Sequence, residues 1–154
     1  NYNMMDINDI KNHINNKSRL IGVDMGSKRV GLSISDENRK IATPLKTVNY
    51  ENIQILADEL KKIANENNVH AIIFGNPKNM DGTEGSSSQS VKDKVKLISE
   101  KIKIPVFLWD ERLSTVGSFN ISSQLDINVT KRVKNIDENA ATFILQGVLD
   151  FLNN

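Results

Sequence analysis

The stretch LIGVDMGSKRVGLSIS, residues 20–35, decides the fold class of this chain. It opens with an apolar segment of strand length, continues through a polar turn at residues 26–29, and then alternates apolar and small residues over 30–34. Residues 41–48 predict a third strand, in which Pro44 favours an edge position because proline cannot donate to the sheet ladder. We therefore expect these strands to form an antiparallel meander.

The hydrophobic period changes after the meander. Apolar residues recur at spacings of three and four over residues 51–66, which predicts an amphipathic helix, whereas residues 71–74 form a wholly apolar strand. The elements expected further on are a helix that starts with a capping box at Ser86 and Gln89, a strand over residues 106–109, and helices over residues 112–123 and 137–153. Apolar strands that alternate with helices pair in parallel through right-handed crossovers. The sequence therefore predicts an α/β domain whose mixed five-stranded sheet, an antiparallel meander plus parallel strands, is flanked by helices.

Length and composition limit the class of protein. The 154 residues fit one domain, which we expect over residues 20–154, preceded by a flexible N-terminal tail over residues 1–19. No apolar run reaches the ~18 residues that a membrane span needs. The first twenty residues also lack the apolar stretch of a secretory signal. These features favour a cytoplasmic protein with no membrane partner, although the chain does not begin with methionine and an upstream targeting segment could have been removed.

The counts of cysteine, histidine and charge restrict the chemistry. The chain has no cysteine, which excludes disulfides, thiolate zinc sites and cysteine nucleophiles. Its two histidines, His13 and His70, are too few and too separated for a histidine-based metal site. Any metal must therefore be held by oxygen ligands. With 20 Lys and Arg against 19 Asp and Glu, the net charge is +1, so the positive charge that a nucleic acid would need must be local.

Acidic residues stand where the expected strands end and where the last helix begins. Asp24 lies near the end of the first strand, and Asp110 and Glu111 come directly after the fifth. Asp137 stands four residues before Ala141, so it continues the buried stripe of the last helix into its first turn. Taken singly, each acid has an ordinary explanation as an exposed strand end or a helix cap. Because the carboxyl ends of parallel strands share one edge of a sheet, we expect these acids to converge there.

Converging carboxylates point to a divalent cation. A cluster of carboxylates repels itself and has raised pKa values unless cations neutralise it. Mg²⁺, or Mn²⁺ in its place, suits oxygen ligands and keeps sites for water and for phosphate oxygens. Two such ions ~3.5–4 Å apart would activate a water and stabilise the leaving oxygen of a phosphodiester. We therefore expect Asp24, Glu111 and Asp137 to be catalytic and to bind the metal. Asp110 is a further catalytic candidate, and whether it or Glu111 binds the metal stays open.

Basic residues accompany these acids along the sequence. The expected contacts to substrate phosphates are Lys28, Arg29, Arg112, Lys131, Arg132 and Lys134. Each alone is an ordinary solvated surface charge, but their repeated pairing with the acids favours contacts to a polyanion without a high net charge. The long loop over residues 76–85 adds Asn79 as a candidate substrate contact, with a purely structural turn as the alternative.

Four blocks of the sequence resemble one known family. They are GVDMGSKRVGLSISD (22–36), FGNPKNMDGTEG (74–85), DERLST (110–115) and KNIDENAATFILQGVLD (134–150). In this order they resemble the YqgF/RuvX family of nucleases, which has a ribonuclease H-like fold, over nearly the whole chain. The resemblance implies a metal-dependent endonuclease with Asp24, Glu111 and Asp137 as its acids, and with Asp110 as the alternative to Glu111.

The resemblance leaves two substrates open. Processing of the 5′ end of pre-16S rRNA, in ribosome biogenesis, is the first expectation, and resolution of Holliday junctions in DNA recombination or repair is the second. The expected partner is therefore a structured nucleic acid, either precursor rRNA or branched DNA. The expected state is a monomer or a homodimer, and junction resolution would require the homodimer because it needs two active sites.

Two other classes of protein share parts of this pattern. Residues 22–27 also resemble the first phosphate loop of actin-like ATPases and sugar kinases, but those proteins need a second such loop and roughly twice this length. A non-catalytic nucleic-acid-binding module is the other alternative. A pure binding module gains nothing from clustered acids that face phosphate, so retention of Asp24, Glu111 and Asp137 favours the nuclease.

Overall fold

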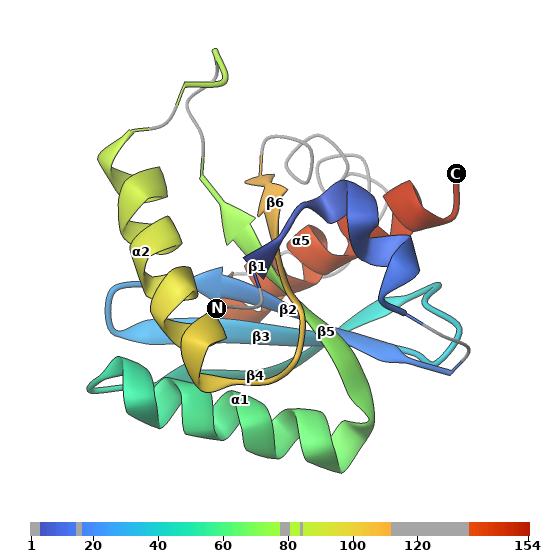
Figure 1. Ribbon diagram of the computed structural model, residues 1–154, viewed down its shortest axis with the longest axis horizontal. Coiled ribbons are helices and arrows are strands. Elements are labelled where there is room, and N and C mark those ends of the chain that lie inside the picture. The colour runs from blue at the N-terminus through green and yellow to red at the C-terminus, as the bar shows by residue number, and fades with distance from the viewer. Residues whose placement is uncertain (1–3, 15–16, 78–80, 84, 112–135) are drawn as a thin grey trace.

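The computed structural model describes residues 4–14, 17–77, 81–83, 85–111 and 136–154 (Figure 1). Within these ranges a mixed six-stranded sheet has the order β1-β6-β5-β2-β3-β4. Its strands are β1 (Met4–Met5), β2 (Arg19–Met25), β3 (Arg29–Ser35), β4 (Ala42–Asn49), β5 (Val69–Asn76) and β6 (Val106–Asp110). The helices are the 3₁₀ helix η1 (Ile7–Asn12) and the α-helices α1 (Ile53–Asn67), α2 (Ser86–Lys101) and α5 (Ile136–Leu152).

The strand pairing confirms the predicted mixed sheet. Strands β2, β3 and β4 form an antiparallel meander, and β2, β5 and β6 pair in parallel. Pro44 lies in β4, which is an edge strand as predicted. The predicted helix over residues 112–123 lies outside the described residues.

The N-terminal segment differs from the flexible tail that we expected over residues 1–19. Met4 and Met5 pair in parallel with β6 and add a sixth strand to the sheet. Ile10 in η1 is fully buried, and Ile7 and Ile14 pack against the same core cluster. The physical reason is that these isoleucines, spaced three and four apart, place apolar surface on one side of the segment, and its burial holds the segment on the domain.

The two faces of the sheet bury separate cores. Helices α1 and α2 cover one face, and α5 and η1 cover the other (Figure 1). The central strand β2 alternates between them: Ile21 and Val23 belong to the core under α1 and α2, and Leu20 belongs to the core under α5. Because both faces of the parallel strands are covered, their apolar runs are continuous. No helix in the described ranges is both long and apolar enough to cross a bilayer.

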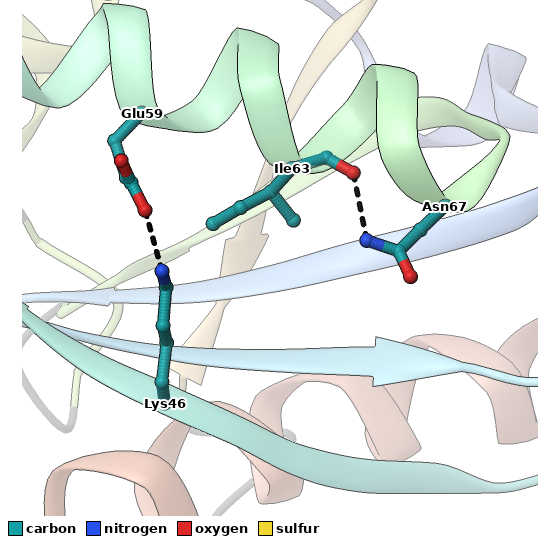
Figure 2. Close-up of polar contacts among 4 residues, drawn as sticks. All are labelled: Lys46, Glu59, Ile63 and Asn67. Carbon is teal, nitrogen blue, oxygen red and sulfur yellow. Dashed lines mark hydrogen bonds and ion pairs between the residues drawn. The ribbon is translucent and has the colours of Figure 1, made fainter.

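Helix α1 is fixed at both ends and along its length. The Asn52 side chain accepts from the Ile55 N–H at the start, and Asn68 ends the helix in the left-handed conformation with φ 55°. Figure 2 shows Lys46 of β4 paired with Glu59, and the Asn67 amide donating to the Ile63 carbonyl. The ammonium of Lys46 holds the pKa of Glu59 below its ordinary value. This ion pair is exposed to solvent and contributes little to stability.

The start of helix α2 corrects the predicted capping box. Helix α2 begins at Ser86 with Gly85 as its N-cap, and no side chain caps it. The hydroxyl of Ser88 is buried instead and donates to Asn76 Oδ1 at 2.7 Å. Asn76 belongs to β5, which extends two residues beyond the apolar run that predicted it. The first turn of α2 is therefore joined to the end of β5 by a tertiary hydrogen bond, and no side chain caps it.

Helix α5 lies close to the sheet because residue 22 is a glycine. A Cβ at Gly22 would lie 2.5 Å from Ser33 Oγ, 2.7 Å from Leu145 Cβ and 2.9 Å from the Ala141 carbonyl oxygen. Ser33 Oγ donates to that carbonyl at 2.7 Å. Any larger residue at position 22 would push the helix away from β2.

The direction of α5 follows from the contacts of its C-terminal half. Gln146 Nε2 donates to the Lys40 carbonyl at 3.1 Å, and Asn153 Nδ2 donates to the Arg39 carbonyl at 2.9 Å. These carbonyls belong to the turn between β3 and β4, beside the start of β2. Helix α5 therefore begins at the opposite end of the strands, beside the point where β2 ends.

Candidate active site

The acidic residues of β2 and β6 meet at one edge of the sheet. Asp24 is the next-to-last residue of β2, Asp110 is the last residue of β6, and Glu111 follows it. Because β2, β5 and β6 are parallel, their carboxyl ends lie at the same edge. Asp24 and Glu111 both line an open pocket of about 580 Å³ there. The structure thus brings together two acids that lie far apart in the sequence.

Strand β5 lies between β2 and β6, and its Gly75 leaves room for Glu111. A Cβ at position 75 would lie 2.9 Å from Glu111 Cγ and 3.1 Å from its Cδ. It would also lie 2.6 Å from Ile144 Cδ1 of α5. The side chain of Glu111 therefore lies directly against the backbone of β5. This position brings the carboxylate towards Asp24, across a strand that would otherwise separate the two acids.

The acids act on one another electrostatically. The pKa of Glu111 is raised from 4.5 to about 7, first by burial and then by the negative charges of Asp24 and Asp110. Desolvation and like charges both disfavour the ionised carboxylate. A cation among these oxygens would reverse the effect and favour the charged form. A raised pKa of this kind is therefore expected at a cation-binding site when no cation is bound.

The position of the third acid, Asp137, is known only from the helix that contains it. Its backbone lies in the first turn of α5, which begins at the edge where β2 ends. The Asp137 side chain lies outside the described residues, so its convergence with Asp24 and Glu111 stays a prediction. Among the residues that the structure describes, no three His, Cys, Asp or Glu side chains are arranged to hold a metal ion. The binding of a metal by Asp24, Glu111 and Asp137 therefore stays a prediction.

The predicted basic contacts divide into two groups. Lys28, in the turn between β2 and β3, and Arg29, the first residue of β3, are both exposed, and they follow Gly26 and Ser27, which line the pocket. The Gly26 N–H donates to the Arg29 carbonyl at 2.9 Å and fixes this turn. The other predicted contacts lie outside the described residues: Asn79, Arg112, Lys131, Arg132 and Lys134.

One wall of the pocket was missed by sequence reasoning. Ser86, Ser87, Ser90 and Lys94 of helix α2 line the pocket together with Asp24 and Glu111. The sequence predicts a helix that starts at Ser86, but its serines and Lys94 were not among the expected site residues. The spacing of four between positions 86, 90 and 94 was the available signal, since it places these residues on one face of a helix.

Solved structures of low sequence identity share this fold. RuvC of T. thermophilus, in complex with Holliday junction substrate, matches with a TM-score of 0.56 at 10% identity and covers 89% of this chain and 97% of its own. The fowlpox virus Holliday junction resolvase matches with a TM-score of 0.51 at 16% identity and covers 88% and 98%. The sheet order and the flanking helices, together with these matches, define a ribonuclease H-like domain.

Sequence comparisons narrow this class to one family. The family model described as "RuvX: Holliday junction resolvase" matches residues 18–151. A protein of Pelagibacter ubique is 61% identical over 98% of this chain and 100% of its own length. One of Rhizobium meliloti is 42% identical over 85% of this chain and 79% of its own. Both carry the name "Putative pre-16S rRNA nuclease". The chain belongs to the RuvX family.

Proposed function

We propose that this chain is a metal-dependent endonuclease that hydrolyses phosphodiester bonds in the maturation of the 5′ end of pre-16S rRNA. One observation carries the chemistry: Asp24 and Glu111 line the same pocket, and the pKa of Glu111 is raised to about 7 by burial and by neighbouring carboxylates. A site with this electrostatics favours a divalent cation. The names of the relatives support the choice of substrate.

Each acid has a role in this proposal. Asp24, Glu111 and Asp137 would hold Mg²⁺ or Mn²⁺ through hard oxygen ligands, with Asp110 beside them. When bound, the ions would supply an activated water and stabilise the leaving oxygen. The water oxygen forms a bond to phosphorus as the bond to the departing sugar oxygen breaks. Lys28 and Arg29 lie beside the pocket and would contact phosphates that flank the cleaved bond.

The proposal includes the setting in which the enzyme works. Its partner is a structured nucleic acid, with precursor rRNA as the substrate and no membrane involved. Maturation of ribosomal RNA places the enzyme in the cytoplasm. One active site suffices for cleavage of one strand, so the proposed reaction requires no dimer.

A side-by-side cleavage assay tests the substrate. Wild-type protein is incubated with Mg²⁺ and either a precursor 16S rRNA fragment or a four-way DNA junction, and its mass in solution is measured. We expect the RNA to be cleaved with a kcat/KM about tenfold or more above that for the junction, a difference of at least ~1.4 kcal/mol. Paired, symmetric incisions in the junction by a dimer, with the RNA left intact, would replace the proposed substrate by the Holliday junction.

Substitution of Gly75 by alanine tests the placement of Glu111. The new Cβ would displace Glu111 and the end of Ile144, both of which are side chains that can move. We expect the fold to be kept at a cost of ~1–2 kcal/mol, and cleavage to fall about 10²-fold because a misplacement of ~1 Å can have that effect. Urea unfolding and single-turnover cleavage measure the two effects. Gly147→Ala, a partly exposed position in α5, is the control and should leave cleavage unchanged.

A further inference from the structure

The pocket has a second wall whose chemistry is opposite to that of the acids. We call it the α2 wall: Ser86, Ser87, Ser90 and Lys94 of helix α2. The three serines are exposed to solvent, and Lys94 is partly buried. They face a pocket whose other side holds Asp24 and Glu111. The site therefore pairs a carboxylate side with a side made of hydroxyl groups and one ammonium group.

Lys94 is available to an anionic ligand. It is the only basic side chain among the described residues that line this pocket. Lys94 also makes no ion pair with any residue in the described ranges. A lysine is a compact point charge with a flexible stem, and it commonly contacts phosphates in this role.

The α2 wall has the geometry of a track for a backbone. Positions 86, 90 and 94 repeat every four residues and so form one line along the helix. This line extends ~12 Å, since each residue of an α-helix rises ~1.5 Å. That is about the axial rise of three nucleotides, at ~3.4 Å per nucleotide of one strand. Several phosphates could therefore contact the wall at once.

Two features hold the α2 wall in a fixed position relative to the acids. Ser88 is buried on the inner side of the helix and donates to Asn76 Oδ1 at 2.7 Å. Asn76 pairs in register with Asp110 at the end of β6. Val91 and Val95 are buried in the core between α2 and the sheet. The wall and the acidic edge are therefore joined through β5.

The chemistry of the α2 wall suits phosphates better than bases. Serine hydroxyls can donate to phosphate oxygens, and Lys94 can neutralise one phosphate charge. No aromatic side chain occurs among the described residues that line the pocket, whereas proteins that grip unpaired bases stack them on aromatic rings. The one tryptophan near this edge, Trp109, is buried in the core beside Phe151 and is not a stacking platform.

We propose that the α2 wall binds the sugar–phosphate backbone of the substrate strand and holds it against the acidic edge, with Lys94 as the phosphate anchor. This inference rests on the proposed nuclease function and adds to it a mode of recognition: the strand is bound through its backbone, independently of its base sequence. Positive charge on the wall also offsets the repulsion between the substrate and the carboxylates of Asp24 and Glu111.

Binding measurements on two matched lysine variants test the inference. Lys94→Gln removes the anchor, and Lys96→Gln removes an exposed lysine two positions away, about 200° around the helix. The dissociation constant is measured with EDTA present, so that cleavage does not interfere, for two duplex RNAs of unrelated sequence at several salt concentrations. We expect Lys94→Gln to weaken binding about fivefold to tenfold for both RNAs and to reduce the salt slope by about one. Lys96→Gln should match the wild type.

A second variant tests the hydroxyl groups. Ser87→Ala combined with Ser90→Ala removes two possible donors from the wall, whereas Gln89→Ala alters an exposed neighbour that does not line the pocket. We expect the double variant to bind about threefold to tenfold more weakly and Gln89→Ala to be unchanged. Circular dichroism verifies that each variant keeps its helices.

The outcomes separate this inference from the proposed function. If Lys94→Gln binds like Lys96→Gln while the wild type cleaves RNA, the α2 wall is not the binding surface and the nuclease stands. Loss of binding to only one of the two RNA sequences would overturn recognition through the backbone. If the wild type binds but does not cleave with Mg²⁺, the nuclease proposal fails, and the lysine comparison still decides the role of the wall. A wild type that binds neither RNA would refute both.

Discussion

The Asp24→Asn variant should lose metal-dependent cleavage while it keeps its fold and its affinity for nucleic acid. The substitution keeps the shape of the side chain but removes the negative charge that a divalent ion would need at the end of β2. Loss of a ligand to the catalytic ions should remove several kcal/mol of transition-state stabilisation, which corresponds to about 10³-fold or more in kcat. Single-turnover cleavage of labelled precursor rRNA with Mg²⁺, and again with Mn²⁺, measures this loss.

Binding by the same variant should be unchanged or tighter. Asp24 lines the pocket that we propose for the phosphodiester, so its charge repels the substrate when no metal is present. Asp58→Asn is the matched control, because Asp58 is exposed on α1 and contacts Gln54 rather than the pocket. Cleavage by Asp24→Asn at the wild-type rate would remove the proposed mechanism. A wild type that binds RNA and never cleaves it would favour the non-catalytic binding module.

Much of the fold could be predicted because burial follows local patterns. The apolar runs of β2 and β5 and the helical stripe of α1 are visible in the sequence, since each element buries a regular set of its own residues. Strand β1 could not be found in this way. It has two residues, and only its pairing with Val106 and Phe107 of β6 defines it as a strand. The 3₁₀ helix η1 has six residues, of which Ile10 is buried. It is too short for a clear hydrophobic period in the sequence.

The meeting of Asp24 and Glu111 at the candidate site could be predicted from the sequence, whereas the residues around them could not. The meeting of Asp24 and Glu111 follows from a general rule about the ends of parallel strands. The part played by Gly75 depends on the strand order, which places β5 between the two acids. The α2 wall is visible as a spacing of four between Ser86, Ser90 and Lys94, but the sequence does not show that α2 lies beside the acids, where Ser88 contacts Asn76. Both features depend on tertiary structure, so local patterns alone could not assign them to the site.

The Glu111→Gln variant should lose cleavage and gain stability at the same time. Glu111 has a pKa raised from 4.5 to about 7 in the folded chain, because burial and the neighbouring acids oppose its ionisation. Between these two pH values the folded chain binds more protons than the unfolded chain, so stability falls as the pH rises. The loss of folding stability that comes from ionising Glu111 is complete above about pH 7. At pH 8 the metal-free variant should be more stable than the wild type by ~1–2 kcal/mol, since solvent screens a partly exposed carboxylate.

The pH dependence separates this effect from an ordinary change in packing. Urea unfolding in EDTA at pH 8, 6 and 4.5 should show the stability advantage of Glu111→Gln shrinking as the pH falls, because protonated Glu111 no longer carries the charge.

Mg²⁺ should stabilise the wild type, since a ligand that binds only the folded state raises its free energy of unfolding. The same Mg²⁺ should stabilise the variant much less. Glu100→Gln, at an exposed position of α2 outside the pocket, is the control for a Glu/Gln exchange. An advantage of Glu111→Gln that is equal at every pH would mean that Glu111 does not carry the raised pKa. Equal stabilisation of both proteins by Mg²⁺ would mean that Glu111 does not bind the metal. A gain in stability from the loss of a carboxylate is expected of a residue that serves chemistry, because a residue kept for the fold would cost stability when replaced.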